Sequence, residues 1–159
     1  MVMNHNIMKK LISLLLCAVF VLSLAACARG VGALEITEKV KEKFSFKYGA
    51  LYSDAYGEWS EFYLSPEMKT KIFGANAEKY TYIKAVSGYF SRDMVSGSEF
   101  IAAELYDRSG REELMAVFYR RAAKKQDAEA RVWCEGNFVF FICDGKAREI
   151  VEFLKREID

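Results

Sequence analysis

Cys27 is the residue whose neighbours point most directly to a chemical reaction. It follows Leu24-Ala25-Ala26, one aliphatic and two small residues. A cysteine thiol becomes a strong nucleophile when it loses its proton, so it can take up a diacylglyceryl group as a thioether. Small residues ahead of it let an extended backbone enter a peptidase. The pattern predicts cleavage after Ala26 and lipidation of Cys27.

The residues before Cys27 agree with this prediction. Lys9 and Lys10 form a basic start, and Leu11–Leu24 is almost wholly apolar. The run is short for a helix that spans a membrane, which needs about 20 residues, but it has the length of the apolar part of a signal peptide. The combination resembles the signal peptide and lipobox of bacterial lipoproteins. An ordinary signal peptide that contains a cysteine and an uncleaved anchor are the alternatives.

Lipidation of Cys27 has consequences for location. A diacylglyceryl thioether supplies two acyl chains, and two chains hold a protein stably to a bilayer where one holds it marginally. We expect a signal peptide at 1–26, a short flexible tether at 27–33 and one folded domain at 34–159. The membrane is then a partner through the lipid anchor, and the domain lies on its extracytoplasmic face.

The rest of the chain lacks the groups of common catalytic sites. The single histidine, His5, lies in the predicted signal peptide, so histidine catalysis and histidine metal ligands are excluded after cleavage. Without Lys9 and Lys10 the chain has 21 basic against 22 acidic residues, a balance that argues against a nucleic-acid partner. We expect no cofactor, no metal site and no catalytic residue. A pair of carboxylates remains the alternative chemistry.

Two further groups of side chains are noteworthy. Residues 44–63 include eight aromatic residues, which are able to stack on sugars but are more typical of a loop packed onto a small core. Arg120, Arg121, Lys124 and Lys125 end a predicted helix. These cations are able to contact an anionic lipid or wall polymer. The alternative, which we favour, is that they lie on a solvated face and stabilise the negative C-terminal end of the helix.

Apolar spacing and capping signals predict the elements that position these residues. Helices are expected at 34–46, 65–74, 109–125 and from Asp144 to the end of the chain, and strands at 80–90, 99–106, 131–134 and 137–143. The helix starts rest on Ser65-Pro66, on a capping box of Ser109 and Glu112, and on Asp144. The order α, α, then β-β-α-β-β-α indicates an α+β domain with one four-stranded, mainly antiparallel sheet and helices on one face.

Cys134 and Cys143 are the two thiols left in this domain. An exported protein favours a disulfide. In the predicted hairpin, however, Cys143 lies about 20 Å along the strand from the turn, whereas a disulfide needs Cα atoms within about 7 Å. We expect both thiols to be free.

Four short segments of the domain, in this order, resemble an uncharacterised family of small Gram-positive lipoproteins that share a domain of unknown function. They are Leu64–Gly74, Ser98-Glu99-Phe100-Ile101, the charged helix with Arg121, and Glu135–Phe141. The resemblance covers most of Ser65–Asp159. It implies a surface lipoprotein of α+β fold and supplies no catalytic residues. This chain departs from the family in a shorter segment at Gln126–Ala130, without the usual tyrosine and proline.

These observations lead to one expected function and two alternatives. We expect a non-enzymatic binding or accessory module of the cell envelope, whose ligand is a protein, a peptide or a glycan. The first alternative is a hydrolase of wall glycan that works through two carboxylates. The second is a structural lipoprotein that assembles with copies of itself.

Overall fold

The computed structural model describes residues 31–46, 48–92, 97–125 and 129–158. They belong to a compact unit, Val31–Asp159, which is distinct from Met1–Gly30. Cys27 and the predicted signal peptide lie outside the described residues. Among the helices that are described, none is long and apolar enough to cross a membrane.

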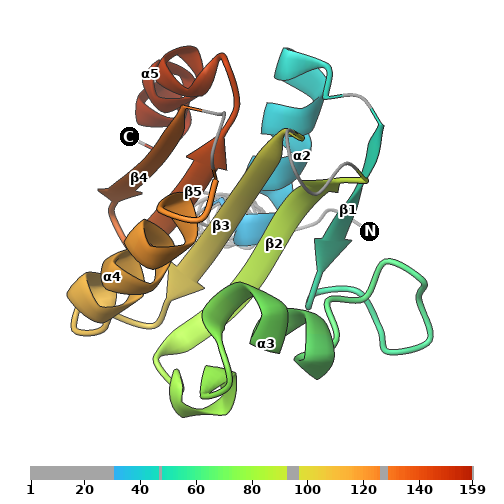
Figure 1. Cartoon of the computed structure of the whole chain (residues 1–159), viewed down its shortest axis with the longest axis vertical. Coiled ribbons are helices and arrows are strands. Elements are labelled where there is room, and N and C mark those ends of the chain that lie inside the picture. The colour runs from blue at the N-terminus through green and yellow to red at the C-terminus, as the bar shows by residue number, and fades with distance from the viewer. Residues whose placement is uncertain (1–30, 47, 93–96, 126–128, 159) are drawn as a thin grey trace, which may run out of the picture. The chain divides into compact units, whose positions relative to one another are not determined.

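One antiparallel sheet of five strands forms the centre of the domain (Figure 1). Across the sheet the strands are β1 (Gly49–Ser53), β2 (Ile83–Ser91), β3 (Glu99–Leu105), β5 (Phe138–Cys143) and β4 (Ala130–Glu135). The α+β class and the antiparallel sheet are confirmed, but the expectation of four strands is wrong. The additional strand is β1, which pairs with β2 from Gly49↔Ser91 to Ser53↔Ser87. Its five residues are too few, and too rich in small side chains, to give an alternating pattern.

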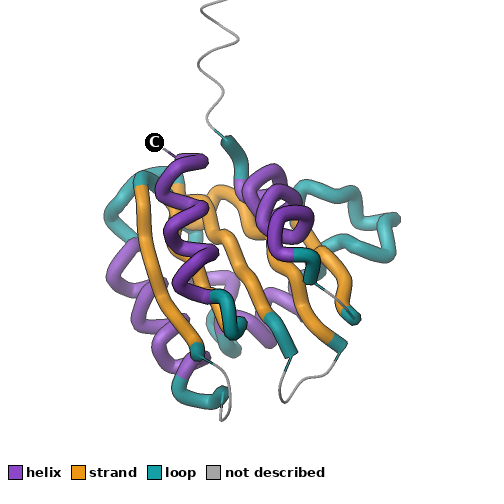
Figure 2. Tube along the Cα trace, turned by 90° about the horizontal axis from the view of Figure 1, so that it is seen from above, coloured by secondary structure: helices purple, strands orange, loops and turns teal. Residues whose placement is uncertain are grey.

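Helices cover both faces of the sheet, not one face as expected (Figure 2). On one face lie α3 (Pro66–Phe73) and α4 (Arg111–Ala122), and on the other α2 (Ala33–Phe44) and α5 (Ala147–Ile158). The cause is visible in the central strands, where neighbouring residues point to opposite faces. Phe141 packs with Leu114 of α4, while Phe140 packs with Ile150 of α5. A strand that is apolar on both sides requires cover on both sides.

The start of α3 follows the sequence prediction closely. The Ser65 hydroxyl accepts the N–H of Met68, Pro66 occupies the first turn, and Gly74 ends the helix with a φ of +96°. Glycine suits that backbone angle because it has no Cβ.

Three expected boundaries are corrected. The capping box is wrong, because α4 starts after Gly110, while the Ser109 N–H donates to the Asp107 carboxylate in a preceding turn. This helix also ends at Ala122 instead of Lys125. At the other end of the domain, Ala33 is buried in α2, so the folded part begins within the expected tether.

The β4–β5 hairpin confirms the prediction for the two cysteines. Cys134 lies opposite Val139, and Cys143 lies opposite Ala130 at the far end of the pair. Both thiols are free. The turn is Gly136-Asn137, one residue later than expected, and Gly136 adopts a φ of +53° there.

Candidate functional site

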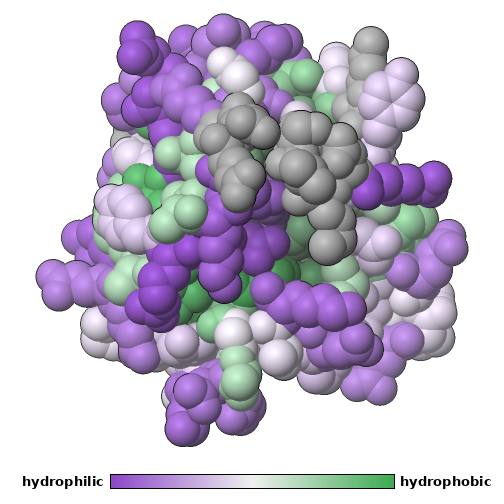
Figure 3. Space-filling view, in the orientation of Figure 1, coloured by the Kyte–Doolittle hydropathy of each residue, from purple (hydrophilic) through white to green (hydrophobic). Residues whose placement is uncertain are grey.

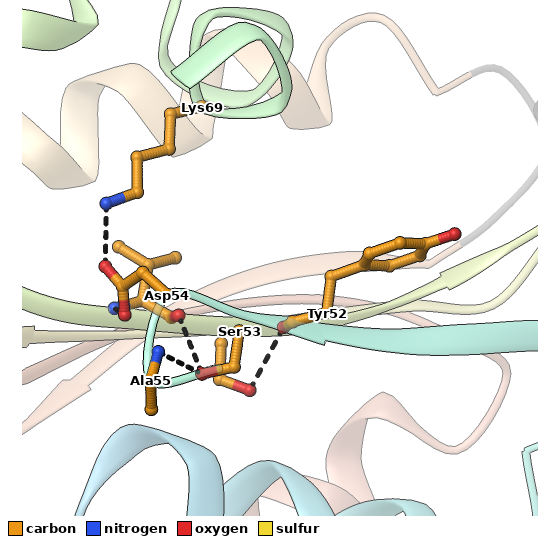
Figure 4. Close-up of polar contacts among 7 residues, drawn as sticks. Tyr52, Ser53, Asp54, Ala55 and Lys69 are labelled. Carbon is orange, nitrogen blue, oxygen red and sulfur yellow. Dashed lines mark hydrogen bonds and ion pairs between the residues drawn. The ribbon is translucent and has the colours of Figure 1, made fainter. Parts of the chain in front are cut away.

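The loop that follows β1, residues 54–64, is held firmly at both ends. The Asp54 carboxylate accepts the backbone N–H of Val86 at 2.9 Å and pairs with Lys69 of α3 at 2.7 Å. The Ser53 hydroxyl accepts the N–H of Ala55 (Figure 4). At the other end Leu64, which is fully buried, donates its N–H to the carbonyl of Ser53. A loop fixed in this way presents its outer side chains in a defined geometry.

A groove of about 510 Å³ lies between this loop, α3 and the edge of the sheet. We call it the β1 groove; its lining residues are Ala50, Tyr52, Glu61, Phe62, Met68, Phe90, Ser91 and Arg92. Its volume lies in the range of pockets for small ligands, about 300–1,000 Å³.

Aromatic rings form the wall of the β1 groove. The Tyr52 ring lies 6.1 Å from Phe62 at an interplanar angle of 60°, and also 6.1 Å from Phe90 at 57°. Such tilted and edge-on contacts fix the rings relative to one another. The aromatic run at 44–63 therefore does more than pack the loop, because part of it lines a surface groove.

Exposed rings lie on the same loop. Trp59 is 92% exposed and Phe62 is 41% exposed. A side chain on Gly57 would collide with the Trp59 ring, whose Nε1 would lie 2.4 Å from the new Cβ, so this glycine allows the ring to rest on the backbone. Large exposed aromatic side chains on a fixed loop are typical anchors of binding surfaces.

Opposite charges lie at the two ends of the β1 groove. The Arg92 N–H donates to the carbonyl of Tyr48, which places Arg92 beside the start of β1. Glu61 precedes Phe62, whose carbonyl accepts the N–H of Ser53 at the end of β1. The groove thus combines an apolar middle with one cationic end and one anionic end.

A second hollow, of about 280 Å³, lies between α3 and α4 and is basic. Its cationic side chains are less available to bind an anionic ligand than the sequence suggests. Arg121 donates to the Lys71 carbonyl, and Lys71 itself pairs with Glu67 at 3.0 Å. The carbonyls at the end of α3 also make this region negative. The hollow is therefore a weaker candidate for an anion than its four cationic lining residues imply, which are Lys71, Arg120, Arg121 and Lys124.

Glu99 pairs with two of the four cations that the sequence places near the end of α4, namely Arg121 and Lys125. Its side chain is buried at the start of β3, and it pairs with Arg121 through Nε at 2.7 Å and with Lys125 at 2.8 Å. The Arg121 guanidinium also lies over the Phe141 ring, 5.8 Å from its centre. The expectation of cations on a solvated face is therefore wrong for Arg121 and Lys125, which neutralise a buried carboxylate.

The remaining chemical groups do not form a second site. Burial raises the pKa of the Cys143 thiol, which disfavours the reactive thiolate. The described part of the chain brings together no set of three His, Cys, Asp or Glu side chains able to hold a metal ion. Of the residues that line the β1 groove, Glu61 alone is a carboxylate.

The surface view shows the face that carries α3 and α4 (Figure 3). Apolar side chains, in green, lie set back in the hollowed middle of this face, and hydrophilic side chains surround them.

No family model, no curated protein and no solved structure matches this chain. The site must therefore be interpreted from its own geometry.

Sequence reasoning found the aromatic segment but not the groove. It did not identify Met68, Phe90 and Arg92 as neighbours of that segment, because these residues come from α3, β2 and the residue after β2. The sequence carries no signal that joins them, because Ala50, Tyr52 and Phe90 share one face only when residues 49–53 are extended and paired with β2.

Proposed function

We propose that this chain is a lipid-anchored extracytoplasmic lipoprotein that serves as a non-enzymatic binding module of the cell envelope. Its ligand occupies the β1 groove. The anchor is Cys27, as the Leu24-Ala25-Ala26-Cys27 pattern predicts. The observation that carries the binding role is the fixed aromatic groove, with Phe62 at its rim and charges at both ends.

Neither alternative function has an observation of its own. A carboxylate-pair hydrolase needs two acids about 5–10 Å apart across a cleft, and Glu61 has no carboxylate partner among the residues lining the groove. Self-assembly requires a self-complementary surface, and such a surface does not call for the aromatic lining of the β1 groove. Binding without turnover fits the aromatic groove better than either.

Photo-crosslinking in cells tests the binding role. A photoreactive phenylalanine analogue replaces Phe62 in the full-length chain, and Tyr119 of α4 is the matched control because it is also aromatic and is 54% exposed. We expect a discrete crosslinked product from position 62 and none from position 119. Equal crosslinking at both positions, or none at either, would contradict a ligand in the β1 groove.

A further inference from the structure

We propose that the ligand is an extended peptide that adds antiparallel to the free side of β1 and inserts one apolar side chain into the β1 groove. This inference rests on the proposed binding function and names the class of ligand. Strand addition to a sheet edge is a general mode of peptide recognition, in which backbone hydrogen bonds give affinity and pockets for alternate side chains give specificity.

The backbone of β1 supplies the first argument. The Ser53 N–H donates to the Phe62 carbonyl and the Ser53 carbonyl accepts the Leu64 N–H, so both groups point away from β2. Backbone groups alternate along a strand, with a period of two residues. Leu51 and Gly49 therefore direct their N–H and C=O groups to the same outer side.

No segment within the described ranges pairs with that outer side along the first part of β1. Among the described residues β1 has one strand neighbour, β2, and the 54–64 loop leaves from the far end of the strand (Figure 1). The loop returns to pair in parallel with Ser53 at Tyr63. The chain thus already occupies the last position of this edge with an extended segment of its own, and Gly49 and Leu51 remain for another.

Side-chain register supplies the second argument. Ala50 and Tyr52 face the β1 groove, whereas Leu51 points to the opposite face and is buried. In an added antiparallel strand, the peptide residues opposite Gly49 and Leu51 exchange hydrogen bonds with them. The peptide residue between these two lies opposite Ala50, so its side chain enters the groove.

Charge supplies the third argument and sets the direction. Arg92 lies beside the start of β1, and Glu61 lies near its end. An antiparallel peptide places its N-terminal side near Glu61 and its C-terminal side near Arg92. The favoured ligand therefore has a cation, a bulky apolar residue and an acid, in that order, along a stretch of about five residues. Opposite charges across an interface fix its register.

The first experiment selects the ligand. A random heptapeptide library displayed on phage is selected against the full-length protein in detergent, and the enriched peptides are synthesised. We expect enrichment of sequences with a basic residue before, and an acidic residue after, an aromatic or long aliphatic residue. Against the double variant Glu61→Lys with Arg92→Glu, we expect the order of the charges to reverse.

The second experiment tests strand addition through the ligand itself. Single backbone nitrogens of an enriched peptide are methylated in turn. Methylation at the two residues that pair with Gly49 and Leu51 should weaken binding about tenfold or more, since each removes a hydrogen bond and adds a clash. Methylation at the residue between them, whose N–H points away from β1, should leave the affinity nearly unchanged.

The controls separate this inference from the proposed function. Phe62→Ala should weaken peptide binding and Tyr119→Ala should not. If no peptide is enriched, or if methylation has no alternating effect, strand addition is wrong. If a chito-oligosaccharide binds and its affinity falls in Phe62→Ala, the groove is a glycan site, and the binding function stands without the peptide. If crosslinking from position 62 also fails, both proposals fall.

Discussion

Glu99 is a buried carboxylate on the face of the sheet that α4 covers. It is 3% exposed, and its charge is balanced by Arg121 in the last turn of α4 and by Lys125 just after that helix. Removing one member of a buried charge cluster costs more than the cluster itself contributes, because the remaining charges keep their desolvation cost.

We expect Glu99→Gln to lower the free energy of unfolding by about 3 kcal/mol. Urea titration followed by circular dichroism measures this change. Glu112→Gln, at an exposed position of α4, is the control and should change stability by less than about 0.5 kcal/mol. Equal effects of the two substitutions would show that the cluster is too well solvated to matter.

Tyr82 gives the domain a dependence on alkaline pH. Burial raises the pKa of its phenol well above the ordinary value of 10.0, and the nearby Glu113 carboxylate adds to the shift. A group with a raised pKa in the folded state holds its proton more tightly there than in the unfolded chain. Its contribution to stability is complete below pH 10.0 and falls as the pH rises from that value toward the folded pKa.

We therefore expect wild-type stability to fall as the pH rises above 10.0, and Tyr82→Phe to show a shallower decline, because phenylalanine has no proton to lose. Urea unfolding at a series of pH values measures both slopes. Tyr106→Phe removes an exposed phenol and serves as the control, with a slope like that of the wild type. A Tyr82→Phe slope equal to the wild-type slope would assign the alkaline loss to other groups.

At the scale of elements, the sequence predicted what local chemistry determines. Ser65, Pro66 and Gly74 specify α3 because each acts through its own backbone geometry. The strand β1 was missed because its conformation depends on pairing with β2, more than 30 residues away in the chain. The second helical layer was missed although Phe140 and Phe141 carried the signal, since a strand that is apolar on both sides needs two layers. The β1 groove was not predicted because it requires the pairing of β1 with β2, which brings Tyr52 next to Phe90.

The two helical layers should contribute comparably to stability. Leu114 of α4 and Ile150 of α5 are both fully buried, on opposite faces of the sheet. We expect Leu114→Ala and Ile150→Ala each to lower the free energy of unfolding by about 2–5 kcal/mol, through lost burial and a residual cavity. Chemical denaturation measures both. A small effect of Ile150→Ala would mean that α5 does not bury its face of the sheet. That result would contradict a sheet covered on both faces.

The start of α4 packs closely against Tyr82, the residue just before β2. A Cβ on Gly110 would lie 2.2 Å from the Tyr82 ring, whereas a Cβ on Gly145 would meet no atom within 4 Å. We expect Gly110→Ala to destabilise the domain by about 1–3 kcal/mol through overpacking, and Gly145→Ala to be neutral or slightly stabilising. Thermal and urea unfolding compare the two. Equal stability of the pair would mean that Tyr82 can move aside without cost.

At the scale of the whole molecule, folding and anchoring depend on different parts of the chain. The two described cores draw on residues from Val31 onward, and Val31–Asp159 forms a compact unit by itself. The proposed anchor, Cys27, precedes that unit. Loss of the anchor should therefore leave the fold intact, just as loss of stability should leave the lipid in place.

This separation makes the placement at the membrane testable without the risk that a variant simply unfolds. We expect Cys27→Ala to lose incorporation of labelled palmitate completely, while its free energy of unfolding stays within about 0.5 kcal/mol of the wild type. Cys134→Ala is the matched control, since Cys134 is a half-buried thiol of β4 outside the Leu24–Cys27 pattern, and it should keep the label. Label retained by Cys27→Ala, or a wild-type protein recovered with the cytosol, would remove the lipid anchor. The β1 groove would still lie on a stable fold in that case, so its ligand would have to be sought in another compartment.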